Sequence, residues 1–292
     1  MDKATVYSHV YRVSMVEPTE RPLRSLIDII KRDELEDRIR AVGNGEVRLD
    51  QIKKERTSDG VSLWYLDFTR FRDTHGPGRT TRRSPVTDIP LEDDDFFGEE
   101  TAALFLPDTG HIIIQYNHFG VRPNAMLNYF SKYLAEEANV YAFNVLLDRD
   151  AERRFRRQRV IRRFEVGIDL SRMSAADRRA GNRLSDMAEI AADDWEGARM
   201  KILVSVGQER DRGLANVKQM LENFVLGNDA VVSAHVTGRE TPGSEIESVD
   251  LIEEKLVYPA EIIPTSKRRL AQQDRFKMLR RAFALWRPRL ES

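Results

Sequence analysis

Residues 102–134 read AALFLPDTGHIIIQYNHFGVRPNAMLNYFSKYL, and this stretch decides the fold. Two apolar, β-prone runs, 103–106 and 111–116, enclose the turn sequence PDTG at 107–110. Gly tolerates the backbone that closes such a turn, and Asp forms local hydrogen bonds with it. The pattern therefore predicts a β-hairpin.

A helix is expected directly after this hairpin. Gly120 ends the second strand, and Pro123 suits the first turn of a helix. Apolar residues then recur at helical spacing, namely Met126, Leu127, Phe130 and Leu134. Strand alternation places Ile112 and Ile114 on the same side of the hairpin. The hairpin is thus predicted to belong to a sheet on which this helix docks.

The rest of the front half is expected to be rich in strands. Apolar alternation and β-branched residues predict strands over 6–15, 47–52, 61–68 and 138–147. Pro22, followed by apolar residues at helical spacing, predicts an amphipathic helix over 22–39 that ends before Gly43-Asn44-Gly45. The front unit is therefore predicted to be a sheet with two covering helices.

Two polar segments interrupt this unit. Residues 70–90 are basic and rich in Gly, Pro, Ser and Thr, so they are predicted to form a mobile loop. The following acidic cluster, 92–100, is interpreted as a solvated turn, because contiguous carboxylates point in different directions on an extended chain. Phe96 and Phe97 are expected to anchor the end of the loop to the core.

The second half has its own apolar periodicity. Strands are predicted over 164–170, 200–206, 230–236 and 249–263, with polar helices in 171–192 capped at Ser174. Apolar residues at helical spacing, Leu214, Val217, Leu221 and Phe224, predict a helix that makes 200–236 a β-α-β unit. A last helix is expected over 267–286. Leu270, Leu279, Phe283 and Trp286 line one face of it, and Arg275 lies with other basic residues on the remaining faces.

These elements predict an α+β protein of two units. The first is a strand-rich sheet domain over residues 1–148. An arginine-rich connector, 149–164, leads to a second α+β domain, 165–292, which ends in the basic C-terminal helix. We expect the chain to divide at the connector, because few core contacts should cross so charged a run.

Composition excludes several classes of protein. The chain has 292 residues, of which 41% are apolar, and no apolar stretch is long enough to span a membrane. The sequence at residues 1–4 lacks the pattern of a signal peptide, and zero cysteines exclude disulfides and thiolate chemistry. The expected location is the cytoplasm.

The net charge of −1 hides a segregation of charge. Residues 149–163 hold eight arginines against two carboxylates, a net +6, and residues 267–289 hold nine basic residues against one carboxylate, a net +8. The remainder therefore carries −15. Two basic segments on an acidic protein favour a specific surface for a polyanion.

Arginine is suited to phosphate because its planar fork makes bidentate contacts and keeps its charge. We therefore predict that these arginines bind nucleic acid. The alternative for these residues is a solvated face paired with carboxylates. The predicted contact residues are Arg153, Arg154, Arg156, Arg157, Arg159, Arg162, Arg163, Lys267, Arg268, Arg269, Arg280 and Arg281.

Enzymatic readings have weaker support. The five histidines are scattered, hydrolase motifs are absent, and no cofactor, metal ligand or catalytic residue is expected. The strongest enzymatic alternative is a Mg²⁺-dependent nuclease using Asp93, Asp94, Asp95 or Glu99. A module that binds an acidic protein partner, and a basic helix that lies on a membrane surface, are further alternatives.

Residues 103–134 also resemble the corresponding stretch of the RexA-like phage-exclusion proteins. The resemblance rests on Phe105-Leu106, Asp108-Thr109 and Phe119-Gly120, followed by a helix that carries Leu127 and Phe130. It covers about thirty residues. It implies a strand-rich front domain with a second domain, a homodimer, sequence-independent binding of duplex (double-stranded) DNA and a role in defence against phage. A partner protein from a neighbouring gene is a separate expectation.

Overall fold

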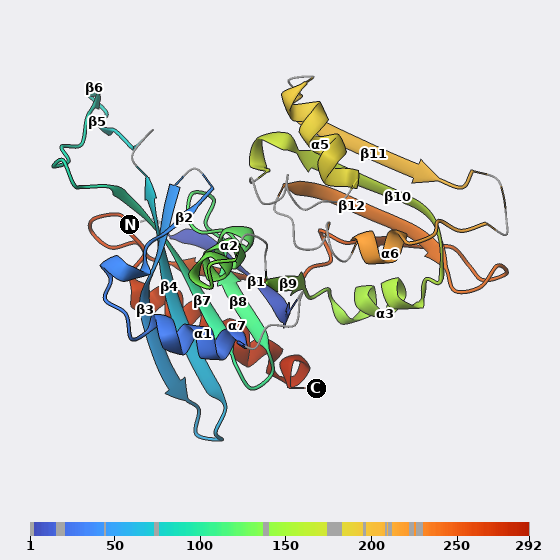
Figure 1. The fold of residues 1–292 in the computed structure, drawn as a ribbon, viewed down its shortest axis with the longest axis horizontal. Helices are drawn as coiled ribbons and strands as arrows, with labels where there is room; N and C mark the ends of the chain where they lie inside the picture. Colours follow the sequence, from blue (N-terminus) through green and yellow to red (C-terminus); the bar gives the residue numbers. More distant parts are fainter. Residues whose placement is uncertain are drawn as a thin grey trace.

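A computed structural model describes residues 3–15, 21–43, 45–72, 76–136, 140–173, 183–194, 197–207, 209, 212–221, 225 and 230–291. Within these ranges the protein is α+β, as predicted, and contains two antiparallel sheets with helices (Figure 1). A separate two-stranded ribbon projects from the first sheet.

The first sheet has the strand order β14-β1-β8-β7-β4-β3-β2, and β9 also pairs with β1. Its core strands confirm the strands predicted for the front half of the chain, and the first strand pairs directly with the second strand of the hairpin. The strands are β1 (Ala4–Met15), β2 (Arg40–Val42), β3 (Gly45–Arg56), β4 (Ser62–Arg72), β7 (Phe97–Leu106), β8 (His111–Gln115), β9 (Tyr141–Val145) and β14 (Val257–Ile262).

The predicted hairpin is β7 and β8, which pair antiparallel through a turn at 107–110. Gly110 closes the turn with a φ of +69°, which suits a residue without a Cβ. Asp108 at the tip accepts a hydrogen bond from Ser62 N at 2.9 Å, so the turn is tied to β4. Ile112 and Ile114 face one buried cluster and Ile113 faces another, as strand alternation requires. The hairpin is therefore buried on both faces.

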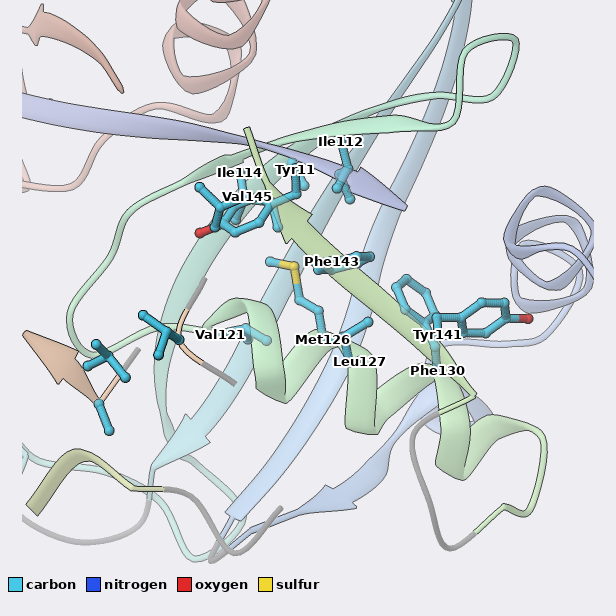
Figure 2. Packing of buried hydrophobic residues seen from close by; sticks show 14 of the residues in the cluster. Tyr11, Ile112, Ile114, Val121, Met126, Leu127, Phe130, Tyr141, Phe143 and Val145 are labelled. Atoms are coloured by element: carbon cyan, nitrogen blue, oxygen red, sulfur yellow. The ribbon is translucent and has the colours of Figure 1, made fainter. Parts of the chain in front are cut away.

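Helices cover the two faces of this sheet. On one face α1 (Leu23–Ile30) and α2 (Pro123–Tyr133) pack in a cluster that includes Met126, Phe130 and Ile114 (Figure 2). On the other face lies α7 (Gln272–Leu290), whose Leu279, Phe283 and Trp286 pack in the cluster of Ile113. Two layers of helix thus enclose the sheet.

The second sheet has the order β11-β10-β12-β13. Because β11 and β12 flank β10 and both run antiparallel to it, they are parallel to each other, and α6 lies on the connection between them. This agrees with the expected β-α-β unit, although β10 is inserted between its strands, and Phe224 lies outside the described residues. The elements are α3 (Arg149–Arg157), β10 (Val160–Asp169), α5 (Arg183–Asp193), β11 (Arg199–Ser205), α6 (Val217–Met220), β12 (Val231–Arg239) and β13 (Glu247–Asp250), with short 3₁₀ turns at Glu36–Arg38 and Leu170–Arg172.

The assignment of the C-terminal helix to the second unit is wrong. Strand β14 pairs with β1, and α7 packs on the first sheet, so the chain returns to its first unit after building the second sheet. The apolar stripe of α7 is what removes Ile113 and Leu104 from water. The helix also starts at Gln272, five residues after the predicted start.

The segment predicted as one strand over 249–263 is two strands in two sheets. Its first part is the end of β13 in the second sheet and its last part is β14 in the first, with a turn at 251–254 between them. Asp250 stabilises that turn by accepting hydrogen bonds from the backbone N–H groups of Ile252 and Glu253. The alternation of apolar and polar residues continues across the turn, so the sequence pattern does not indicate that the strand is interrupted there.

Two further predictions for the front half need correction. The helix predicted over 22–39 ends at Ile30, because the buried spacing of Leu23, Leu26, Ile27 and Ile30 is not continued beyond it. The predicted loop over 70–90 contains the ribbon β5 (Arg79–Thr81) and β6 (Ser84–Thr87), which pair antiparallel. The expected helix cap at Ser174 lies outside the described residues.

Candidate nucleic-acid interface

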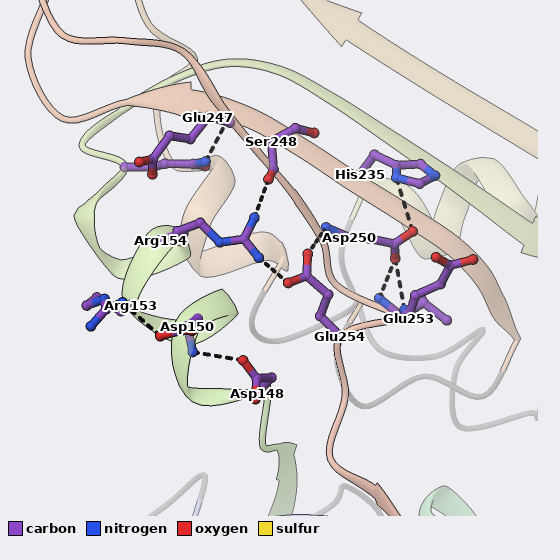
Figure 3. Close-up of polar contacts among 12 residues, drawn as sticks. Asp148, Asp150, Arg153, Arg154, His235, Glu247, Ser248, Asp250, Glu253 and Glu254 are labelled. Carbon is purple, nitrogen blue, oxygen red and sulfur yellow. Dashed lines mark hydrogen bonds and ion pairs between the residues drawn. The ribbon is translucent and has the colours of Figure 1, made fainter.

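The arginine-rich connector folds as helix α3 followed by the start of β10. Asp148 caps the helix by accepting a hydrogen bond from Asp150 N at 2.9 Å, and this bond holds the pKa of Asp148 below its usual value (Figure 3). Glu152 lies in the first turn and three arginines lie in the last, an arrangement that complements the helix dipole. Ala151 and Phe155 are buried and anchor the helix. The remaining face is free to carry charge.

Five arginines surround a hollow of about 430 Å³ on this face. Two glutamates also line it, which leaves an excess of three positive charges. The side chains of Arg153, Arg156 and Arg157 are 64%, 70% and 48% exposed. The lining residues are Arg149, Glu152, Arg153, Arg156, Arg157, Arg159 and Glu240.

Some of these arginines also form ion pairs with neighbouring carboxylates. Arg153 lies 2.7 Å from Asp150, and Arg156 lies 2.5 Å from Glu152. Arg157 lies 3.1 Å from Glu247. Such exposed pairs contribute only about 0–1 kcal/mol each, so a phosphate can replace the carboxylate at small cost.

Arg154 was predicted to contact nucleic acid, but its side chain bonds to another part of the chain. One of its Nη atoms donates to Ser248 O at 2.8 Å, and the other pairs with Glu254 (Figure 3). Glu254 in turn accepts a hydrogen bond from Asp250 N. Arg154 therefore ties α3 to the turn that leads from β13 to β14, and it is not among the residues that line the hollow.

Arg162 and Arg163 lie on β10 and also lie outside the lining of the hollow. Arg163 pairs with Glu165 at 2.9 Å, and Arg162 donates to Gly207 O at 3.1 Å. Their positions on an extended strand separate them from the helical face. Two of the predicted contact residues thus belong to a different surface.

The predicted residues of the second basic stretch are not gathered with the first. Lys267, Arg268 and Arg269 precede α7, whose other end approaches α3 through the ion pair Arg289–Glu152. The 19 residues of α7 separate these ends by roughly 27 Å. Arg269 pairs with Glu100, and Arg280 lies 3.5 Å from Glu55, whereas Arg281 is exposed.

Arg275, expected on an outer face, is almost fully buried at 1% exposure. Its guanidinium makes two hydrogen bonds to Asp67, at 2.5 and 2.9 Å, and Gln272 Nε2 donates to the same carboxylate at 2.6 Å. Burial raises the pKa of Asp67 against the opposing effect of Arg275. This group fixes α7 on β4.

Only the first part of the acidic cluster is an exposed turn as predicted, because Glu99 and Glu100 lie on β7, where Glu99 pairs with Arg72 at 3.1 Å and Glu100 pairs with Arg269. Every residue from Glu92 to Asp95 is exposed, and no three His, Asp or Glu residues in the described ranges are placed to hold a metal ion. Phe96 is 46% exposed and contacts the ring of Phe71, so it does not reach the core as expected.

A family model described as a family of unknown function, DUF6731, matches residues 18–284. The chain belongs to the DUF6731 family. The match runs from before α1 into α7, so in this DUF6731 chain it includes the second sheet and all strands of the first sheet except β1. Among curated proteins, none matches it.

A helical projection finds the lining of the hollow better than composition does. Arg149, Arg153, Arg156 and Arg157 recur at spacings of three, four or one residues and share one face with Glu152. Arg149 was omitted from the predicted set although the same projection includes it, and Arg154 falls outside that face. Glu240 comes from the end of β12 and has no sequence signal that connects it with α3.

Proposed function

We propose that this protein binds nucleic acid, with duplex DNA favoured, through the arginine-lined hollow on α3. The observation that carries the proposal is the convergence of five arginines on one face around a hollow with only two carboxylates. Phosphates present regularly spaced negative charges to which arginine forks are complementary. Such contacts carry no base information, so the binding is independent of sequence.

The proposed contact set is Arg149, Arg153, Arg156, Arg157 and Arg159. Arg154 and Arg162 are left out because their guanidinium groups bond to other segments of the chain. Arg163 is left out because it lies on β10, outside the lining of the hollow. The residues around α7 are left out because they lie along a helix that leads away from the hollow.

The test is a fourfold variant, R153A/R156A/R157A/R159A, measured by fluorescence anisotropy with a labelled duplex over a range of KCl concentrations. Each phosphate contact contributes about 0.9 to the slope of log affinity against log salt, so the slope should flatten by about two to four units. Unrelated duplexes should lose affinity equally.

The matched control is K267A/R268A/R280A/R281A, which removes the same four positive charges from exposed positions around α7. It should leave the salt slope close to that of the wild type. Equal losses in both variants would reduce the proposal to a general effect of charge. A wild-type protein that binds no nucleic acid at low salt would overturn it.

The same preparations separate the alternatives. EDTA-sensitive cleavage of plasmid in Mg²⁺ would favour the nuclease that uses Asp93–Asp95 or Glu99. Binding to an acidic protein without binding to DNA would favour an interaction module. None of the helices in the described ranges has the length and apolar content of a membrane span.

We also propose that two copies associate through the arm formed by residues 76–96. Every residue of the arm is exposed, including Val86 at 68% and Phe96 at 46%. Its ribbon carries Arg79, Arg82 and Arg83, and the segment after it carries Asp88 and the acidic run 92–95. Two antiparallel arms therefore bring opposite charges together and cover each other's apolar side chains.

Charge exchange tests the arm. R82E/R83E should shift the mass measured by light scattering from dimer to monomer, and adding D93K/D94K to the same chain should restore the dimer. A wild-type monomer at every concentration, or a dimer that tolerates R82E/R83E, would contradict this role.

We propose that this protein acts in the cytoplasm in defence against phage, together with a partner from a neighbouring gene. The resemblance of residues 103–134 to the RexA-like proteins supports this setting. Phage plating on cells that carry the wild-type gene or the fourfold α3 variant tests it. Equal plating efficiency on both strains and on cells without the gene would remove this setting and leave the binding proposal standing.

A further inference from the structure

A second cleft, of about 290 Å³, lies where the two sheets of the chain meet. Its walls come from three places. The first sheet contributes β1, β8 and the start of α2, the second sheet contributes β12, and the third wall is the segment that connects β13 to β14. Ligand pockets measure about 300–1,000 Å³ and occur preferentially at such boundaries. This cleft is at the lower end of that range, so it suits a small ligand.

The strands give this cleft a wall of rings and aliphatic side chains. His9 and Tyr11 are two residues apart on β1, so their side chains point to the same face of the sheet, and Ile114 of β8 pairs directly with His9. The second sheet contributes Val231 and Val232, the first two residues of β12. Such a wall is suited to holding a flat apolar group.

A guanidinium stacks on an aromatic ring in the same cleft. Arg122 Cζ lies 4.5 Å from the ring centroid of Tyr116, and the ring centroid of His9 lies 5.9 Å from that of Tyr116. Nη1 of Arg122 also donates to Tyr116 Oη at 3.4 Å. Stacking uses the face of a guanidinium, whereas phosphate is bound by the N–H groups at its edge, so both contacts are compatible. Tyr116 is 37% exposed and therefore accessible to a ligand.

The charge of this cleft is positive. Arg122 and Lys255 line it, and no Asp or Glu in the described parts of the chain does so. A cleft whose walls carry one sign of charge concentrates ions of the opposite sign. The hollow on α3 differs, because it has two glutamates among its arginines and neither Tyr nor His among its lining residues. Rings, aliphatic side chains and two cations are together complementary to a ligand with a flat apolar part and an anionic part.

We infer that the cleft between the two sheets binds a nucleoside phosphate. The base packs against Tyr116 and the valines of β12, and Arg122 and Lys255 supply the positive charge for the phosphate. A free nucleotide and the 5′ end of a single-stranded nucleic acid both offer this combination of base and phosphate. The cleft shares no lining residue with the hollow on α3, so the inference does not depend on the proposed function.

Thermal unfolding of the full chain with mononucleotides tests the inference. AMP, GMP, CMP and UMP are added separately at constant ionic strength, with adenosine and inorganic phosphate as the two parts of the ligand. At about 100 times its Kd, the best mononucleotide should raise the Tm by about 5 °C, and either part alone should have a smaller effect. No response to any mononucleotide, or an equal response to inorganic phosphate alone, overturns the inference.

V232E tests the position of the site. Val232 is 41% exposed, so a carboxylate there is tolerated by the fold, but it opposes the positive charge of the cleft. V204E is the matched control, because Val204 is 37% exposed on β11 and does not line the cleft. V232E should lose the response of the Tm to mononucleotide, and V204E should keep it. A full response in V232E overturns the inference.

R122Q/K255Q tests the anionic part of the ligand. Calorimetry should show mononucleotide binding weakened by about 100-fold, because two charge-assisted contacts are lost, while adenosine binding changes little. R122K, which keeps the charge without the planar fork, should give a smaller loss. An equal loss for adenosine overturns the role of these cations. If the double variant does not fold, V232E decides alone.

A single-stranded pentanucleotide with a 5′ phosphate separates the two sources of the ligand. Binding that V232E abolishes assigns the site to the end of a nucleic-acid strand, whereas a response to mononucleotides alone assigns it to a free nucleotide. The fourfold α3 variant should keep its response to mononucleotides, and V232E should keep its binding to duplex DNA. Failure of the proposed function and failure of this inference are therefore distinguishable.

Discussion

The two basic stretches, 149–163 and 267–289, are nearly indistinguishable by composition and differ in what their charges do. On the short helix α3 only Ala151 and Phe155 are buried, so most of its surface can present arginines to a ligand. On α7 one face packs on β1, β4, β7, β8 and β14 of the first sheet, and Arg275 is buried in an ion pair with Asp67, while Arg280 and Arg269 form exposed pairs with Glu55 and Glu100. The comparison teaches that the packing of the carrier helix, more than the number of arginines, decides whether a basic run is available for binding.

The largest expected effect on stability comes from replacing Arg275 in α7. R275A leaves Asp67 buried and without its fork partner, which should cost about 3–5 kcal/mol of unfolding free energy in urea denaturation. R153A in α3 is the matched change at an exposed position and should stay within about 0.5 kcal/mol of the wild type. A similarly small loss in R275A would contradict the structural role given to the second stretch.

A pH test follows from His111, whose ring lies 3.0 Å from Thr109 Oγ1. Burial, then Arg12, then Arg289 at the end of the second stretch lower its pKa from 6.5 to about 4. The unfolded chain therefore takes up the proton first, so this contribution to stability is complete above about pH 6.5 and is lost as the pH falls toward 4.

Replacing this group by an uncharged amide, H111Q, should remove that component of the pH dependence. Between pH 6.5 and 4.5 the variant should lose about 1–2 kcal/mol less stability than the wild type, after allowance for partial exposure. Parallel curves of Tm against pH for the two proteins would show that His111 is not the titrating group.

Limited proteolysis compares the two basic stretches directly and involves the smallest expected effect. Trypsin needs local unfolding to cut a packed helix. Cleavage within residues 149–163 should therefore precede cleavage within residues 275–289. The exposed arm, which carries Arg82 and Arg83, should be cut before both. After a cut in the first stretch, the two fragments should still co-elute, because β14 and α7 remain packed on the first sheet. Separation of the fragments on gel filtration would contradict this packing.

Sequence periodicity predicted the hairpin well because each of its signals is local. The turn residues and the alternation around Ile113 depend only on neighbours along the chain. The position of α7 was not predictable in this way, since an amphipathic face records that a helix is covered and not by which sheet. The strand predicted over 249–263 failed for the same reason, because alternation persists where the chain crosses from one sheet to the other.

The candidate site was predicted only in part. Composition located the arginine run, and helical spacing separates Arg153 from Arg154, but the pairing of Arg154 with Glu254 requires a contact across 100 residues.

The return of α7 to the first sheet also has a consequence for synthesis on the ribosome. The surface that carries Val10, Leu104 and Ile113 is complete long before residues 272–290 emerge from the exit tunnel. During that interval it remains an uncovered apolar face on a nascent chain, which is the kind of surface that chaperones recognise. Completion of the earliest part of this protein therefore waits for the last helix to be translated.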